Sequence, residues 1–182
     1  MRGITKWRRY LVPADCAEKV EEIDLHALWT RGLRGLILDL DNTLTRWNQV
    51  EVPPPVAQWV EAARRLGFAL CLVSNGLPAR VGMTARCLGI PALARAVKPS
   101  RRAFLRALEL LGTEAGSTCV VGDQLFTDIL GGNRAGMYTI LVRPRDRREL
   151  PTTRLVRFLE GIVLRRWERK GLLCWGRPAG KG

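Results

Sequence analysis

The stretch Gly35-Leu36-Ile37-Leu38-Asp39-Leu40-Asp41-Asn42-Thr43-Leu44 decides the fold of this chain. Its apolar beginning is typical of a buried strand, which we expect over residues 34–39. Asp39 and Asp41 come at the end of this run, and Asn42 and Thr43 predict that the chain turns there. Two acids at a buried strand end are costly unless a cation or a reacting group compensates them. The stretch therefore predicts a hard divalent metal and a phosphate at the carboxyl edge of a sheet.

Strands and helices alternate along the rest of the chain. Further strands are expected at 68–73, 92–97, 118–121 and 138–142. A short helix is expected to begin at Pro13, and a second one to run to Arg31 after the N-cap Asp24. A third is expected to begin at Pro53 and to end before Gly67. Further helices are expected over 78–88, 100–111 and 126–135. This alternation predicts an α/β fold with a parallel sheet, right-handed crossovers and helices on both faces.

Polar residues follow three of the expected strands. They are Asp39 and Asp41 after the first, Ser74 and Asn75 after the second, and Asp123 and Asp128 after the fourth. The carboxyl ends of parallel strands lie at one edge of a sheet, so these residues are expected to meet in one crevice. Taken singly, Asp123 or Asp128 could be a helix cap, Ser74-Asn75-Gly76 a turn and Lys98 a solvated cation.

These residues resemble the haloacid dehalogenase (HAD) phosphatase superfamily over roughly residues 33–143. Its four motifs occur in order: Leu38-Asp39-Leu40-Asp41-Asn42-Thr43-Leu44, Val73-Ser74-Asn75-Gly76, Lys98-Pro99 and Gly122-Asp123-Gln124-Leu125-Phe126-Thr127-Asp128. The resemblance implies a Rossmann-like three-layer α/β sandwich around a central parallel sheet. It also implies hydrolysis of a phosphomonoester through an aspartyl-phosphate, with Mg²⁺ as the cofactor.

The same resemblance assigns a role to each motif. Asp39 would be the nucleophile, and Asp41 the general acid and then the base that activates water. The metal ligands would be Asp39, the backbone carbonyl of Asp41 and Asp123, with Asp128 acting through water or by orienting Asp123. Ser74 and the Asn75 amide would hold phosphoryl oxygens, and Lys98 would offset negative charge.

The motifs lie too close together for a cap domain, because neither the interval from Asp41 to Ser74 nor that from Ser74 to Lys98 has room for one. An open site suits a large or surface-bound substrate. The flap Thr45-Arg46-Trp47-Asn48 is the natural place for substrate contacts, although Trp47 could merely pack. Within the superfamily the motifs resemble the subfamily III, YqeG-like phosphatases, whose relatives include phosphatidylglycerophosphatases. The resemblance thus implies an anionic phospholipid substrate.

Excess positive charge is concentrated at the two ends of the chain. The formal net charge is +13, from 30 Lys and Arg against 17 Asp and Glu, and residues 11–142 are nearly balanced. Such ends predict an anionic partner, which could be a phospholipid surface, nucleic acid or the ribosome, while a solvated arginine-rich surface is the alternative. Without an apolar run long enough to cross a bilayer or to serve as a signal peptide, we expect a cytoplasmic protein, peripheral at the inner membrane face.

The C-terminal part, 144–182, completes a single 1–182 hydrolase domain as a basic amphipathic segment. Residues 151–170 have helical periodicity, and Leu164 departs from the apolar face. That face would carry Leu155, Val156, Phe158, Leu159, Ile162, Val163 and Trp167, opposite Arg154, Arg157 and Arg165. The helix could lie on anionic lipid or pack on the sheet.

Two other functions stay open at this point. One is a phosphatase acting on nucleotides or on the ends of polynucleotides, since an open site and basic ends suit these substrates as well. The other is a protein that binds RNA or the ribosome and carries a vestigial site. Intact motifs argue against the second.

Overall fold

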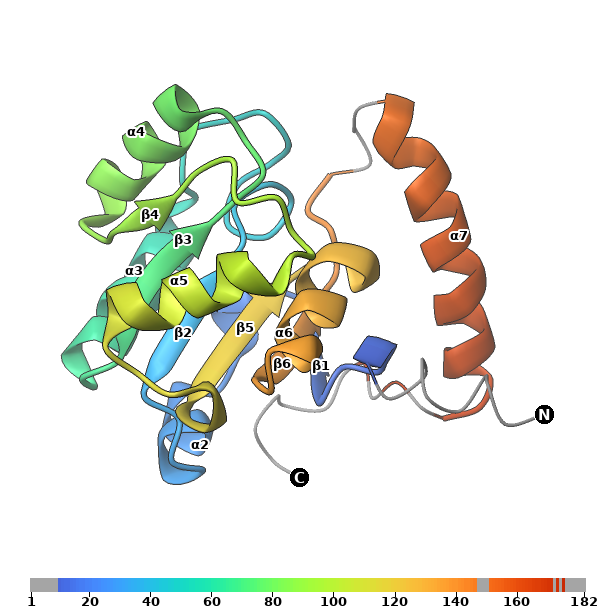
Figure 1. Ribbon diagram of the computed structural model, residues 1–182, viewed down its shortest axis with the longest axis horizontal. Helices are drawn as coiled ribbons and strands as arrows, with labels where there is room; N and C mark the ends of the chain where they lie inside the picture. The colour runs from blue at the N-terminus through green and yellow to red at the C-terminus, as the bar shows by residue number, and fades with distance from the viewer. Residues whose placement is uncertain (1–9, 147–150, 172, 174, 176–182) are drawn as a thin grey trace.

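A parallel sheet with β2 (Gly35–Leu38) near its centre organises the protein, as the computed structural model in Figure 1 shows. The structure describes residues 10–146, 151–171, 173 and 175, and of 151–157 only the backbone. Within these residues the sheet has six strands in the order β1-β6-β5-β2-β3-β4. The other strands are β1 (Asp15–Ala17), β3 (Ala69–Val73), β4 (Ala92–Leu93), β5 (Thr118–Gly122) and β6 (Tyr138–Val142).

Strand register brings the ends of the three central strands together. Leu38, the last residue of β2, is paired with Leu72 of β3 and with Val121 of β5. The chain leaves β2 toward β3 and β4, and later returns to add β5 and β6 on the other side of β2. This reversal makes the end of β2 the topological switch point, where open α/β sheets bind their ligands.

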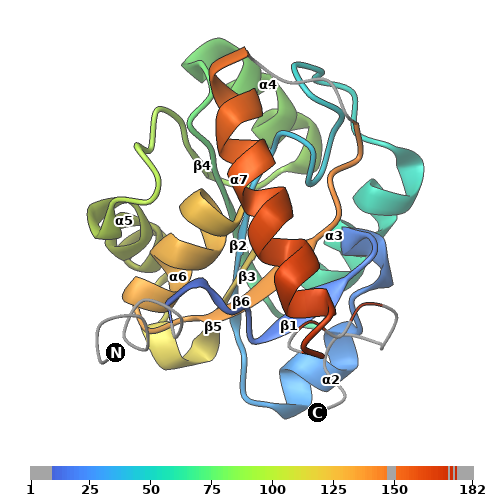
Figure 2. The same ribbon diagram turned by 90° about the vertical axis from the view of Figure 1, so that its right-hand side faces the viewer.

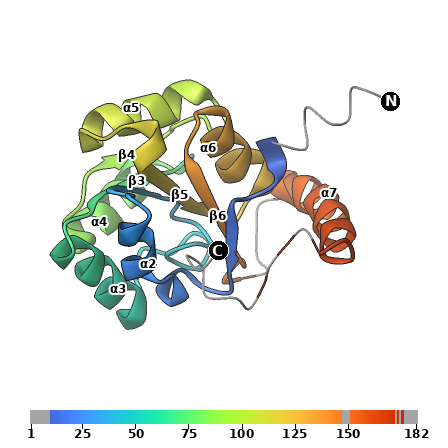
Figure 3. The same cartoon turned by 90° about the horizontal axis from the view of Figure 1, so that it is seen from below.

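Alternate residues of the central strands pack against helices on opposite faces of the sheet, which gives three layers (Figure 3). Leu36 and Leu38 join a core with α2 (Leu25–Thr30), α3 (Pro54–Arg65) and α4 (Pro78–Leu88). Ile37 points the other way, toward α5 (Arg101–Leu111) and α6 (Leu130–Arg134). A strand buried on both faces explains why its sequence is continuously apolar.

Sequence signals account for the ends of these helices. The Asp24 carboxylate accepts a hydrogen bond from the Ala27 amide at 3.0 Å and caps α2, as predicted. α3 and α4 each begin with proline, which needs no intrahelical acceptor at that position. Gly112 follows the last residue of α5, and its φ of 63° suits glycine. Short 3₁₀ segments, Val20–Glu22 and Ala115–Ser117, complete the connections.

Three expectations about secondary structure were wrong in detail. No helix opens at Pro13; the chain instead forms β1, a short edge strand that exists because it pairs with β6. The strand expected over 92–97 ends at Leu93, because Arg95 and Val97 take positive φ angles and turn the chain. The helix expected over 126–135 begins as a π-helix, η3 (Leu125–Ile129), and continues as α6.

Helix α7 (Pro151–Glu168) lies apart from the two helical layers and crosses the β1 edge of the sheet (Figure 2). Its inner side buries Trp167 with Cys16 of β1 and Leu141 of β6, and Val163 and Leu164 pack on the same cluster. Phe158, Leu159 and Ile162 remain exposed. The expected apolar face is therefore split, and the prediction that Leu164 lies on the polar side was wrong. The side chains of Arg154, Leu155, Val156 and Arg157 lie outside the described residues, as do residues 1–9.

Candidate active site

Asp39 is the first residue after β2, and the sheet fixes its backbone. Its amide donates to the Val121 carbonyl at 3.0 Å, so strand pairing continues one residue beyond β2. The carboxylate is buried, which removes it from water in an otherwise apolar strand end. Burial raises the pKa of Asp39 to about 6, against the opposing effect of the Lys98 ammonium. A carboxylate held at this energetic cost is typical of a functional group.

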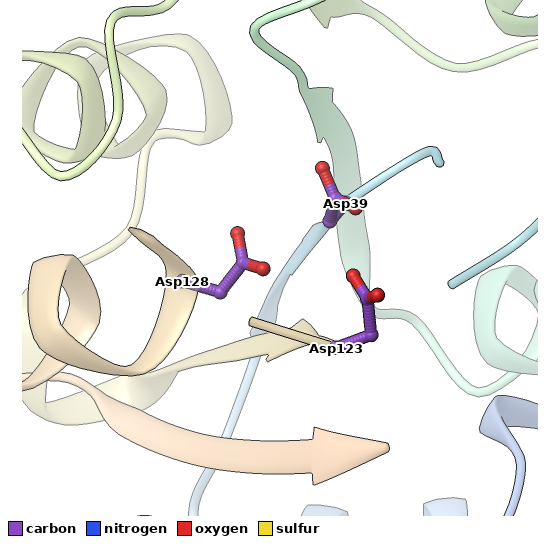
Figure 4. A group of neighbouring side chains, drawn as sticks. All are labelled: Asp39, Asp123 and Asp128. Carbon is purple, nitrogen blue, oxygen red and sulfur yellow. The ribbon is translucent and has the colours of Figure 1, made fainter. Parts of the chain in front are cut away.

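Two further aspartates converge on Asp39 from another strand end (Figure 4). Asp123 follows β5, and Asp128 is the fourth residue of η3; both are buried. One carboxylate oxygen from each of the three aspartates lies within 4.8 Å of the others. The Thr43 hydroxyl lies 3.3 Å from an oxygen of Asp39 and 3.3 Å from one of Asp123. This set of oxygen donors fits a hard divalent cation.

Gly122 makes room for Asp128. A Cβ atom at position 122 would lie 2.3 Å from the carboxyl carbon of Asp128, a distance that no side chain tolerates. The wide π turn then carries Asp128 back over the end of β5, where it accepts a hydrogen bond from the Gln124 amide at 3.2 Å. The glycine before Asp123 is thus required by a close approach.

Lys98 joins two of the acids. Its Nζ lies 2.5 Å from an oxygen of Asp39 and 2.6 Å from one of Asp128, and its side chain is 4% exposed. Burial lowers the pKa of Lys98, but the carboxylates of Asp128 and Asp39 outweigh burial and raise that pKa above its usual value. The ammonium therefore stays charged beside the Asp39 carboxylate. The structure brings Lys98 to the site, as expected from the third motif.

The loop after β3 and the loop before Lys98 are bound to each other. The Asn75 side chain accepts from the Lys98 amide at 2.8 Å and donates to the Lys98 carbonyl at 3.3 Å. Ser74 is buried, and its hydroxyl accepts from the Gly76 amide at 3.0 Å. The Ala96 amide donates to the Ser74 carbonyl at 3.1 Å. Ser74, Asn75 and Lys98 thus form one rigid unit beside the acids.

Asp41 lies outside the cluster of three carboxylates. Arg80 of α4 binds both of its oxygens, with Nη1 to Oδ1 at 2.7 Å and Nη2 to Oδ2 at 2.5 Å. The amide of Asn48, in the expected flap, also donates to Oδ1 at 3.0 Å. Asp41 is thus held apart from the other three carboxylates, and sequence reasoning missed its partner Arg80. Its only sequence signal was the helix start at Pro78, which puts position 80 in the first turn beside the Ser74-Asn75-Gly76 loop.

Contacts that two other residues make in support of the site were also missed. The Arg145 side chain donates to the Thr43 carbonyl at 2.7 Å, and it forms an ion pair with Glu21. Glu160 of α7 is buried and accepts a hydrogen bond from the Phe126 amide in η3 at 2.9 Å. Each joins parts of the chain that are distant in sequence, and no local pattern indicates such pairing.

Comparison with known proteins agrees with this geometry. A family model described as HAD-hydrolase-like matches residues 96–149. The "Probable phosphatase YqeG" of Bacillus subtilis is 36% identical over 168 residues, which cover 92% of this chain and 98% of that protein. The "Phosphatidylglycerophosphate phosphatase 1, chloroplastic/mitochondrial" of Arabidopsis thaliana is 32% identical over 93% of this chain, which spans only 51% of the plant protein.

One solved structure, of an uncharacterized protein from Listeria monocytogenes serotype 4b, matches with a TM-score of 0.52 and 20% identity. The match covers 72% of this chain and 98% of the other, and it supports the fold alone. Among the described residues of the present chain, no helix is long and apolar enough to cross a membrane.

Proposed function

The chain belongs to the HAD-like hydrolases, in the family of YqeG of Bacillus subtilis, and we propose that it is a magnesium-dependent phosphatase of phosphomonoesters that works through an aspartyl-phosphate. The observation that carries this proposal is the buried carboxylate of Asp39, which shares Lys98 with Asp128 and lies beside Asp123. A nucleophile, a cation and a set of oxygen ligands are the parts that phosphoryl transfer needs.

In the proposed reaction Asp39 attacks phosphorus, and the bond from phosphorus to the leaving oxygen breaks. Asp41 gives a proton to the leaving alkoxide and then takes one from the water that hydrolyses the aspartyl-phosphate. Lys98 offsets charge on the nucleophile and the phosphoryl group, and Ser74 and the Asn75 amide hold phosphoryl oxygens. Cleavage of the acyl phosphate restores Asp39 and releases inorganic phosphate.

The metal would be held by Asp39, Asp123 and the Asp41 backbone carbonyl, with Asp128 orienting its neighbours. When bound, Mg²⁺ neutralises part of the negative charge of the phosphoryl group. The three carboxylates fit this role, because one oxygen of each lies within 4.8 Å of the others and carboxylate oxygens are the ligands that such a cation prefers.

For the substrate we propose phosphatidylglycerol phosphate. The name of the Arabidopsis relative supports this lipid, and so does the surface around the site. Leu77 is 64% exposed directly after the Ser74-Asn75-Gly76 loop, and Val97 is 71% exposed directly before Lys98. Backbone hydrogen bonds join these two loops, so two exposed apolar side chains flank one phosphate site. Such a rim suits a lipid-water interface better than a small metabolite in water.

Helix α7 supports peripheral binding at the cytoplasmic membrane face. Phe158, Leu159 and Ile162 are exposed on it, and cationic residues follow in its last turn and just beyond: Arg165, Arg166, Arg169 and Lys170. Each Lys or Arg near an anionic surface adds about 1 kcal/mol of attraction. We expect the protein to sediment with vesicles that contain anionic lipid and not with neutral vesicles.

A paired assay tests the function. Wild type and the Asp39→Asn variant are given Mg²⁺ and either phosphatidylglycerol phosphate in vesicles or an oligonucleotide with a 3′-phosphate. We expect wild type to release phosphate from the lipid and the variant to release none from either substrate. Release from the oligonucleotide alone would favour a polynucleotide-end phosphatase. Salt-dependent RNA binding without turnover of any ester would favour the RNA-binding alternative.

A further inference from the structure

Arg80 is placed where it can contact the part of the substrate that leaves. Its guanidinium binds both oxygens of Asp41, at 2.7 and 2.5 Å, from the first turn of α4. The pair lies at the mouth of the site, because the side chain of Arg80 is 18% exposed and that of Asp41 is 22% exposed. By comparison, Lys98 is buried deeper and binds Asp39 and Asp128. The site therefore has two cations in different positions.

In an in-line displacement, the two cations would lie on opposite sides of the reacting phosphorus. The attacking oxygen of Asp39 and the leaving oxygen lie on opposite sides of phosphorus. Asp41 must reach the leaving oxygen in order to protonate it, so its carboxylate belongs to the leaving side. Arg80 contacts that carboxylate directly, whereas Lys98 contacts the nucleophile. Of these two cations, Arg80 is therefore the nearer to the leaving alcohol.

The geometry points to Arg80 as a residue that determines specificity by binding a second negative charge, a phosphodiester or a phosphate carried by the leaving alcohol. This inference rests on the proposed phosphatase activity, and it names the substrate feature that the site selects. An arginine has five N–H donors, and Asp41 uses two of them. The remaining donors suffice for an anionic group a few bonds from the scissile oxygen.

An arginine with a purely structural role would act equally on every ester, because it would only hold Asp41 in place. An arginine that binds the leaving group would act selectively on esters whose leaving alcohol is charged. The ratio of kcat/KM for a charged and an uncharged leaving group therefore separates the two roles. Loss of a charge-assisted hydrogen bond to substrate corresponds to about 10- to 100-fold in that ratio.

Two water-soluble esters form a matched pair for this measurement. Glycerol 1-phosphate has a neutral leaving alcohol, and glycerophosphoglycerol phosphate has the same glycerol with a phosphodiester attached. Vesicles of phosphatidylglycerol phosphate form a third arm, which shows whether the charge must be presented by a lipid or is recognised free in solution. The variants are Arg80→Gln and Arg80→Lys, and Arg86→Gln, an exposed arginine further along α4, is the control.

We expect the kcat/KM of wild type to be at least about tenfold higher for glycerophosphoglycerol phosphate than for glycerol 1-phosphate. Arg80→Gln should abolish most of this preference, chiefly through KM, with a smaller loss on glycerol 1-phosphate. Arg80→Lys should keep part of it because the charge remains, and Arg86→Gln should keep all of it. If Arg80→Gln does not fold, as judged by its melting curve, the ratio for Arg80→Lys decides the question.

Equal losses of Arg80→Gln on charged and uncharged leaving groups, or a wild type that prefers neither the soluble phosphodiester nor the vesicles over glycerol 1-phosphate, would overturn the role assigned to Arg80 while leaving the phosphatase intact. The proposed function fails in a different way: wild type with Mg²⁺ would then hydrolyse none of the three substrates. A preference found only with vesicles would sustain the inference and identify a lipid headgroup as the source of the charge.

Discussion

Replacing Asp39 by Asn should remove a pH-dependent loss of folding stability, which burial of the Asp39 carboxylate causes in the metal-free protein. Burial raises the pKa of Asp39 to about 6, whereas an aspartate in the unfolded chain titrates near 4. The folded state therefore holds this proton more tightly than the unfolded state does. The contribution of this proton to the free energy of unfolding is fully present below about pH 4 and is lost as the pH rises through about 6. A shift of about two pH units corresponds to about 3 kcal/mol.

The assay is urea unfolding of wild type and Asp39→Asn between pH 4 and 7.5 in the presence of a chelator. The free energy of unfolding of wild type should fall by about 3 kcal/mol relative to that of the variant over this range, because the variant lacks the carboxyl group whose pKa burial raises. Glu109→Gln, which changes an exposed acid on α5, is the control and should run parallel to wild type.

Magnesium should offset this loss of stability in wild type far more than in Asp39→Asn. A hundredfold excess of Mg²⁺ over its dissociation constant should add about 2.7 kcal/mol to the unfolding free energy of wild type at pH 7.5. Asp39→Asn, which lacks one ligand, should gain much less. Parallel pH curves for wild type and Asp39→Asn would refute the reasoning, because Asp39 would then carry no cost of burial.

Three further substitutions follow from contacts in the fold and the site. Gly122→Ala should lower kcat at least about tenfold and also lower the melting temperature, because the new Cβ displaces the buried Asp128 carboxylate, which pairs with Lys98; steady-state kinetics and a melting curve measure this. Asp24→Ala should cost about 1 kcal/mol of unfolding free energy through loss of the α2 cap, measured by urea unfolding. Glu160→Ala should leave the Phe126 amide without this acceptor and cost about 1–3 kcal/mol, and amide exchange in α7 and η3 should become faster. Unchanged kinetics, stability or exchange in the respective variant would contradict each expectation.

Most of the sheet and all of the acidic cluster could be predicted because both depend on local signals. Apolar runs such as 35–38 and 138–142 are continuous where a strand is buried on both faces, and the parallel order places their polar successors at one edge. β1 was missed for the opposite reason. It is three residues long, lies at the edge, and forms through its pairing with β6.

The rest of the site could not be predicted because its contacts join distant segments without a periodic pattern. Arg80 reaches Asp41 from another helix, and Glu160 reaches Phe126 from α7. The π-helix at η3 places Asp128 over Gly122, where it reaches Lys98. This is a tertiary contact, and helix propensity along the sequence does not predict it. For α7, periodicity predicted the helix, but the burial of Glu160 and the partial burial of Leu164 depend on the surface against which the helix packs.

The central claim is that Asp39 becomes phosphorylated during turnover. Acid quenching of wild type within the first turnover on a substrate with a labelled phosphoryl group, followed by peptide mapping, tests it most directly. The label should be found on the peptide that contains Asp39, and Asp39→Asn should carry none. Label on a different residue, or steady release of phosphate by folded Asp39→Asn, would contradict the claim.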